Sequence, residues 1–371
     1  MGSMQGAQII VLATPVFLLL IALEVAVGVA RGRNTYRLND ALSSIGLGIM
    51  SQISGVFAKA MTLGLYALAF THLSLWQLAS NAVWVWVVAL VLYDFCYYWH
   101  HRLGHTCALF WAAHVVHHQS EDYNLSTALR QTSSGWLVGW LFYLPMALLG
   151  FPPLVFAVVA LVDLLYQFWV HTEQIGRLGW FDRWFCAPSN HRVHHAVNDR
   201  YLDRNYGGIL IVWDRLFGSY QEEDANEPCV YGTRAPLRSW NPLRANVQVY
   251  WELAKDSWRT ERTTDKLRVW LMPPGFRPAD VAAKYPKPAF ALDAVRRYDP
   301  SAPRAALLVA AALFLLLLGA TAAFLWSAHL LDAWQQAAGA VAIVAGLWLV
   351  AALSEGRGAG SAEGLGSRLS S

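Results

Sequence analysis

The chain has 371 residues, of which 56% are hydrophobic and only 14% are charged. A soluble domain is about 45–50% apolar and about 25% charged, so this composition excludes both an ordinary solvated globule and a disordered chain. The net charge of +3 gives no reason to expect a nucleic-acid partner. The four cysteines form no CxxC pair, which argues against a zinc ribbon or a disulfide framework. Two features remain to be explained, the eighteen tryptophans and the twelve histidines.

Apolar stretches long enough to cross a membrane recur along the chain, and a crossing helix needs about 20 residues. Seven spans are predicted, at residues 8–30, 42–70, 82–99, 135–150, 153–170, 304–328 and 334–353. The first is interrupted only by Glu24, and the short fourth and fifth meet at a Gly-Phe-Pro-Pro turn that suits a helical hairpin. The expected fold class is an all-α integral membrane protein with about seven transmembrane helices.

The charges in the loops predict the orientation of these helices. Arg31, Arg33 and Arg37 follow the first span, whereas residues 71–81 contain no Asp, Glu, Lys or Arg. The positive-inside rule therefore places the N-terminus outside, and residues 31–41, 100–134 and 171–303 in the cytoplasm.

The chain is expected to divide into five regions. They are N-terminal transmembrane helices (1–81), a catalytic region (82–235), a cytoplasmic or interfacial segment (236–303), a C-terminal transmembrane hairpin (304–353) and a disordered Gly/Ser-rich tail (354–371). Residues 241–271 mix Trp with Arg and Lys, which is typical of a helix on the membrane surface but fits a packed cytoplasmic helix equally well.

Eight histidines form three short motifs, HRLGH (101–105), HVVHH (114–118) and HRVHH (191–195). Residues four apart share a helix face, so each motif presents at least two imidazoles together. Imidazole suits Zn, Cu, Fe and Ni, and eight ligands are too many for one ion, so two ions with open positions are expected. His171 emerges from the fifth span on the same side and is expected to be a ninth ligand. The predicted ligands are His101, His105, His114, His117, His118, His171, His191, His194 and His195.

Other histidines and other kinds of metal protein fit this pattern less well. His100 points about 100° away from His101 on a helix, and His72 and His329 are predicted on the far side of the membrane. The chain has no HExxH motif, so a zinc protease is not expected. A metal transporter would place ligands along a path through the spans, whereas these motifs share one face, which favours an enzyme.

Three polar residues near the motifs are candidates for a supporting role. Asp94 precedes His101 by about two helical turns, and Asp163 lies inside the fifth span, where an ionisable residue is costly and usually functional. Either could accept a hydrogen bond from the second nitrogen of a ligand imidazole, although Asp94 could instead cap a helix. Gln167, one turn before His171, could ligate weakly, bond a bound water or simply be packed.

The order HxxxH…HxxHH…HxxHH resembles the fatty acid hydroxylase/sterol desaturase superfamily of membrane di-iron oxygenases, over about residues 85–225. Four stretches look more specifically like the alkylglycerol monooxygenases, which cleave ether lipids using tetrahydrobiopterin. These stretches are residues 114–131, 168–173 (FWVHTE), 190–220 and 273–276 (PPGF). The resemblance implies two iron ions held by the eight motif histidines, and zinc can replace iron in recombinant protein because imidazole accepts both. It places Glu121, Asn124 and Tyr206 around the active site, and Glu173 and Asn190, which lie in the matched stretches, are further pocket candidates.

The implied reaction uses O2 and external electrons to hydroxylate a lipid drawn from the bilayer. In an alkylglycerol, attack at the carbon beside the ether oxygen would give a hemiacetal that collapses to an aldehyde and a glycerol derivative. The electrons come either from tetrahydrobiopterin or from a redox protein. The polar residues 121–131 could bind a pterin, bind a headgroup, or cap the next helix and hold the ligand imidazoles. The alternatives are a sterol desaturase, a fatty acyl or carotenoid hydroxylase, and a non-enzymatic membrane metal-binding or transport protein.

Overall fold

The computed structural model describes residues 6–356, and its regular secondary structure within that range is helical, with two isolated β-bridges in the loops. Five helices are long and apolar enough to cross a bilayer, as expected of an integral membrane protein. They are α1 (Gly6–Ala30), α2 (Leu38–Leu73), α3 (Val83–Thr106), α14 (Arg304–Ser327) and α15 (Ala333–Ser354).

The structure provides five such helices rather than the seven predicted. The stretch 135–150 is divided into α6 (Trp136–Gly139), the 3-10 turn η1 (Trp140–Tyr143) and α7 (Leu144–Leu148). The next helix, α8 (Pro153–Trp169), has 17 residues. At about 1.5 Å per residue it is about 25 Å long, short of the roughly 30 Å hydrocarbon core. These segments form a hairpin shorter than two full spans. The tail predicted to be disordered starts at residue 354, but Ser354 ends α15 and Glu355 accepts a hydrogen bond from the Ser239 side chain. The rest of the tail, beyond Gly356, lies outside the described residues.

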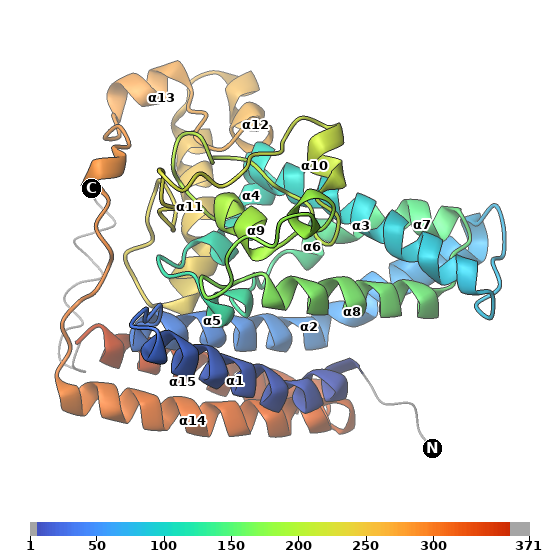
Figure 1. Ribbon diagram of the computed structural model, residues 1–371, viewed down its shortest axis with the longest axis horizontal. Helices are drawn as coiled ribbons and strands as arrows, with labels where there is room; N and C mark the ends of the chain where they lie inside the picture. Colours follow the sequence, from blue (N-terminus) through green and yellow to red (C-terminus); the bar gives the residue numbers. More distant parts are fainter. Residues whose placement is uncertain (1–5, 357–371) are drawn as a thin grey trace.

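The long helices form two layers around α2 (Figure 1). Helices α1, α14 and α15 lie on one side of α2, where Ile49 and Ile53 pack against Phe314 of α14 and Leu347 of α15. The second half of α2 joins α3, α7 and α8 in another apolar cluster. The start of α1 lies beside the end of α14, since the Gln8 side chain donates to the Trp326 carbonyl over 3.5 Å.

The polar parts of the chain gather at one end of this bundle (Figure 1). The end of α1, the start of α2, the start of α14 and the end of α15 all lie there, together with the helices of the polar region. The N-terminal end of α1 and the α2–α3 loop lie toward the opposite end. The polar regions of the chain therefore share one end of the bundle, and their cytoplasmic position stays a prediction.

Short helices build the polar end. They are α4 (Ala108–His118), α5 (Leu125–Ala128), η2 (Phe181–Arg183), α9 (Pro188–His194), α10 (Val212–Leu216), α11 (Pro242–Arg259), α12 (Thr263–Leu271), α13 (Ala279–Lys284) and η3 (Leu292–Ala294), while η4 (Ala328–Leu330) links α14 to α15. The segment predicted at 241–271 is α11 and α12. Helix α11 packs against α4, as the packed-helix interpretation predicts. Trp251 and Trp258 on its other face are 55% and 86% exposed, and a position at the membrane surface stays a prediction.

Candidate metal centre

The nine predicted ligands converge at the polar end of the bundle from four elements of the fold. Helix α3 carries two, α4 carries three, α9 with the residue after it carries three, and His171 follows α8. They form two groups, in each of which the ligand nitrogens lie within 4.8 Å of one another. Site 1 consists of His101, His105, His114, His118 and His194, and site 2 consists of His117, His171, His191 and His195. Each group could hold a metal ion.

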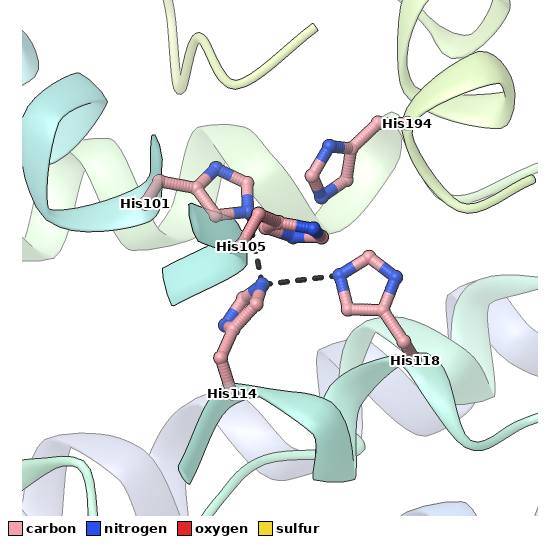
Figure 2. A group of neighbouring side chains, drawn as sticks. All are labelled: His101, His105, His114, His118 and His194. Carbon is pink, nitrogen blue, oxygen red and sulfur yellow. Dashed lines mark hydrogen bonds between the residues drawn. The ribbon is translucent and has the colours of Figure 1, made fainter. Parts of the chain in front are cut away.

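In site 1 the five imidazoles surround a common centre (Figure 2). The His114 Nε2 atom lies 3.0 Å from the Nε2 atoms of both His101 and His118. A metal–imidazole bond is about 2.0–2.1 Å long, so two nitrogens at right angles around one ion lie about 3.0 Å apart. The Nε2 atoms of His105 and His194 are buried and have no hydrogen-bond partner among the described residues. Ring nitrogens about 3.0 Å apart, and buried ring nitrogens without a hydrogen-bond partner, are both expected of histidines that bind one metal ion.

In site 2 the tautomers of two histidines can be deduced from their partners. The Nδ1 atom of His117 lies 2.8 Å from the Arg130 carbonyl, and that of His171 lies 2.8 Å from the Gln167 carbonyl. Because a carbonyl only accepts, each Nδ1 carries the single hydrogen of a neutral imidazole. Both Nε2 atoms therefore bear lone pairs, yet they face each other at 3.1 Å. Two lone pairs so close repel each other unless a cation lies between them.

The imidazoles that lie outside the spanning helices are kept in this neutral form by burial. Burial lowers the pKa of His117 to about 4. Burial, together with the neighbouring imidazoles, holds the pKa of His118, His191 and His195 well below the usual value. Metal ions bind the neutral form of histidine, so both groups are ready to ligate at neutral pH.

The loop after the third motif orients three ligands of site 1. The His101 Nδ1 atom lies 2.8 Å from the Tyr206 carbonyl, and the His194 Nδ1 atom lies 2.9 Å from the Arg204 carbonyl. The Asp203 carboxylate lies 3.3 Å from His105 Nδ1. The sequence offers no signal for Arg204, because any residue can supply a carbonyl, or for Asp203, which lies outside the histidine motifs. Tyr206 was named, and its ring also lies 5.4 Å from that of His105.

The carboxylates expected to hold imidazoles have other partners. Asp94 accepts from the backbone N–H groups of Ile209 and Leu210 (2.7 and 3.0 Å) and from the Trp213 indole (2.8 Å), so it braces the segment after Tyr206. Asp163 instead accepts from the Gln167 side chain.

That Gln167 side chain lies between two polar groups. It donates to Asp163 over 2.6 Å and accepts from the Tyr97 hydroxyl over 2.6 Å. Only its backbone carbonyl contacts a predicted ligand, His171. A Cβ atom on Gly208 would lie 2.9 Å from a carboxylate oxygen of both Asp94 and Asp163, which explains the glycine between them.

The remaining pocket candidates have structural contacts. Glu121 accepts from the backbone N–H of Tyr298, and Asn124 caps α5 by accepting from Ser126 N over 3.0 Å. Asn190 accepts from Ala187 N over 3.0 Å at the start of α9, and Glu173 lies beside the Tyr231 hydroxyl.

Residues 121–131 are likewise engaged in holding the fold together. Arg130 is 1% exposed and donates to the Val116 carbonyl at the end of α4 over 2.8 Å. Asp122 accepts from Arg37 over 2.8 Å. Of the three roles considered for this segment, these contacts correspond to bracing.

Nine histidines thus lie in two groups at one end of an apolar helical bundle. Residues 86–219, a range that contains all nine histidines, match the fatty acid hydroxylase family. The chain is similar to the alkylglycerol monooxygenases of Homo sapiens and Danio rerio, at 40% and 39% identity over 267 residues. Both matches cover 72% of this chain and 59% of the relative, so the chain spans about three fifths of their length. It is also 29% identical to the ornithine lipid hydroxylase OlsE of Rhizobium tropici over 181 residues, which are 48% of this chain and 54% of that protein. No solved structure matches the chain significantly.

Proposed function

We propose that the chain is a membrane-bound di-iron monooxygenase that hydroxylates an alkylglycerol ether lipid at the carbon beside the ether oxygen. The observation that carries the metal centre is the pair of Nε2 lone pairs of His117 and His171, which face each other at 3.1 Å in a buried site. The substrate class rests on the identity to two alkylglycerol monooxygenases.

The two sites fit iron and differ in what they leave open. Five imidazoles at site 1 leave one position of an octahedral ion, and four at site 2 leave two. When bound, two ferrous ions would supply the oxygen activation and the oxidising power for C–H cleavage. We therefore place the lipid carbon nearer to site 2, where more positions are free.

The chain's own residues position ligands and exclude water. Tyr123 is 1% exposed, stacks on the His171 ring at 5.6 Å and donates to the Val170 carbonyl over 2.9 Å. It therefore covers site 2 and fixes the turn that carries His171. A hemiacetal collapses without a protein nucleophile, so the reaction requires no further catalytic side chain.

Tetrahydrobiopterin and a redox protein are the two candidate electron donors. The side chains of residues 121–131 that could recognise a pterin are engaged within the fold, as Asp122 is with Arg37. These contacts support a donor that binds elsewhere, and we place the donor and the active site on the cytoplasmic side, from the arginines at residues 31–37.

The test is aldehyde formation by purified, iron-loaded protein supplied with an alkylglycerol and O2. Tetrahydrobiopterin is added in one arm, and a reduced ferredoxin or cytochrome system in the other. His195→Ala should abolish the product, and His329→Ala, at an exposed position between α14 and α15, should not. Oxidation of a sterol, fatty acyl or carotenoid substrate in place of the alkylglycerol would favour those enzymes instead. Metal flux into liposomes without any oxidised lipid would favour a transporter.

A further inference from the structure

A pocket of about 250 Å³ lies beside the interrupted segment that replaces the fourth predicted span. Its walls come from the second half of α2, from α6, η1 and α7, and from the start of α8. The side chains that shape it include Tyr66, Trp136, Trp140, Tyr143, Leu144 and Phe156. The pocket therefore lies where the chain changes from α6 to η1 to α7.

The polar atoms of these walls are used within the protein. Tyr66 donates to the Phe151 carbonyl over 2.9 Å, and its ring stacks on Phe156 with centroids 4.1 Å apart. The indoles of Trp136 and Trp140 donate to the carbonyls of Ser133 and Leu137, over 2.9 and 3.1 Å. What remains toward the pocket is mainly hydrocarbon and aromatic surface, which suits an apolar ligand.

One wall of the pocket contacts His100, the residue that precedes a member of site 1. A Cβ atom on Gly139 would lie 3.2 Å from the His100 ring, and Tyr143 packs against the same ring at 6.2 Å. His100 immediately precedes His101, a member of site 1. From there the pocket extends toward α7, which lies away from α4 and α9 (Figure 1).

The surroundings of the pocket indicate where its ligand comes from. On the same segments, Leu137, Leu141 and Leu154 are 51%, 47% and 64% exposed. Exposed leucines on a hairpin beside apolar spanning helices suit contact with lipid tails, so an apolar ligand of this pocket is expected to come from the bilayer.

We propose that this pocket holds the far part of the alkyl chain of the lipid substrate while its polar end lies at the metal centre. This assignment rests on the proposed function. Moving an alkyl chain from the bilayer into the pocket removes no apolar surface from water, because lipid tails are as apolar as leucine. The pocket therefore discriminates by volume, and it sets the chain length that the enzyme accepts.

The experiment compares two leucine-to-tryptophan variants on the same segment. Leu144→Trp places a large ring in the pocket, whereas Leu141→Trp places it on the lipid-facing surface. With octadecyl glycerol, Leu144→Trp should lower kcat/KM about tenfold, which corresponds to ~1.4 kcal/mol. With octyl glycerol it should change kcat/KM less than twofold, and Leu141→Trp should change neither value. Equal losses on both chain lengths, or equal effects of the two variants, would overturn the assignment.

Photocrosslinking tests whether the alkyl chain occupies the pocket independently of whether the reaction takes place. An octadecyl glycerol with a diazirine near the end of its chain should label residues 136–144, and unlabelled octadecyl glycerol and Leu144→Trp should both reduce that labelling. Such labelling without aldehyde formation would support the assignment of the pocket and refute the proposed reaction. Aldehyde formation without labelling of residues 136–144 that unlabelled substrate reduces would refute the assignment of the pocket and support the proposed reaction.

Discussion

Arg192 lies between two members of the metal centre in sequence, and its replacement by methionine is predicted to damage site 2. Its guanidinium makes two hydrogen bonds of 2.7 Å to the Glu223 carboxylate. It also donates to the carbonyls of Thr172 and Ile175, over 3.0 and 2.8 Å. Arg192 thus ties α9 to the turn that follows His171, and Arg192→Met removes all four bonds.

The burial of the Arg192–Glu223 ion pair determines how much stability Arg192→Met is expected to remove. The side chain of Arg192 is 9% exposed and that of Glu223 is 20% exposed. Burial alone would lower the pKa of the guanidinium, but the bonds to Glu223 outweigh it, and the pKa is raised. Breaking a buried pair from one side costs about 3–5 kcal/mol, and partly exposed Glu223 places the loss near the lower value, about 3 kcal/mol. Loss of a group that supports a ligand typically weakens metal affinity about 10–100-fold.

The assay is urea denaturation of the detergent-solubilised protein, paired with metal retention under a chelator. Arg200→Met is the matched control, because Arg200 pairs with Asp224 at the same 2.7 Å while their side chains are 49% and 31% exposed. A surface pair of this kind adds little to stability. Arg192→Met should lower the free energy of unfolding and release one ion early, whereas Arg200→Met should match the wild type. If the two variants behave alike, burial does not determine what the Arg192 pair contributes.

Three further outcomes are expected. His171→Ala should leave about one metal ion per chain where wild type holds two, and His329→Ala should leave two; retention of both ions by His171→Ala would remove it from the ligand set. Burial lowers the pKa of His117 to about 4, so protons compete with the metal only near that pH. The ion of site 2 should therefore remain bound near pH 5.5, where an imidazole with a pKa of about 6.5 is mostly protonated, and release of that ion near pH 6.5 would contradict the argument. Cysteines introduced at the exposed positions Leu75 and Ala225 should be labelled from opposite sides of the membrane, and labelling of both from one side would refute the topology.

The sequence predicted the histidines of the centre well because their signal is local. Spacings of three and four residues on a helix fix which imidazoles share a face, so His114 and His118 could be paired before any fold was known. The division of the nine histidines between site 1 and site 2 could not be predicted from the sequence. His117 belongs to site 2 although His118 belongs to site 1, since adjacent residues on α4 point about 100° apart and only the placement of α9 decides which partners they meet.

Composition predicted apolar segments, but it could not tell which of them span. Residues 135–150 are as apolar as a crossing helix, yet the chain there changes from α6 to η1 to α7 and ends at Gly150, whose φ is +86°. A Cβ atom at Gly150 would lie 1.8 Å from the Trp76 carbonyl, so glycine is required by a contact with the α2–α3 loop. A contact between segments so far apart leaves no periodic signal in the sequence.

The partners of the imidazoles distinguish this centre from a structural metal site. Four of the five Nδ1 contacts are made by neutral carbonyls, those of Arg130, Gln167, Arg204 and Tyr206, and one by a carboxylate. Carbonyls fix the tautomer and the ring direction without adding negative charge. Two divalent ions among neutral ligands would therefore keep nearly their full positive charge in a buried, low-dielectric site. Such a site stabilises negative charge that develops on a bound group, which oxygen activation requires and a closed four-ligand zinc site does not provide.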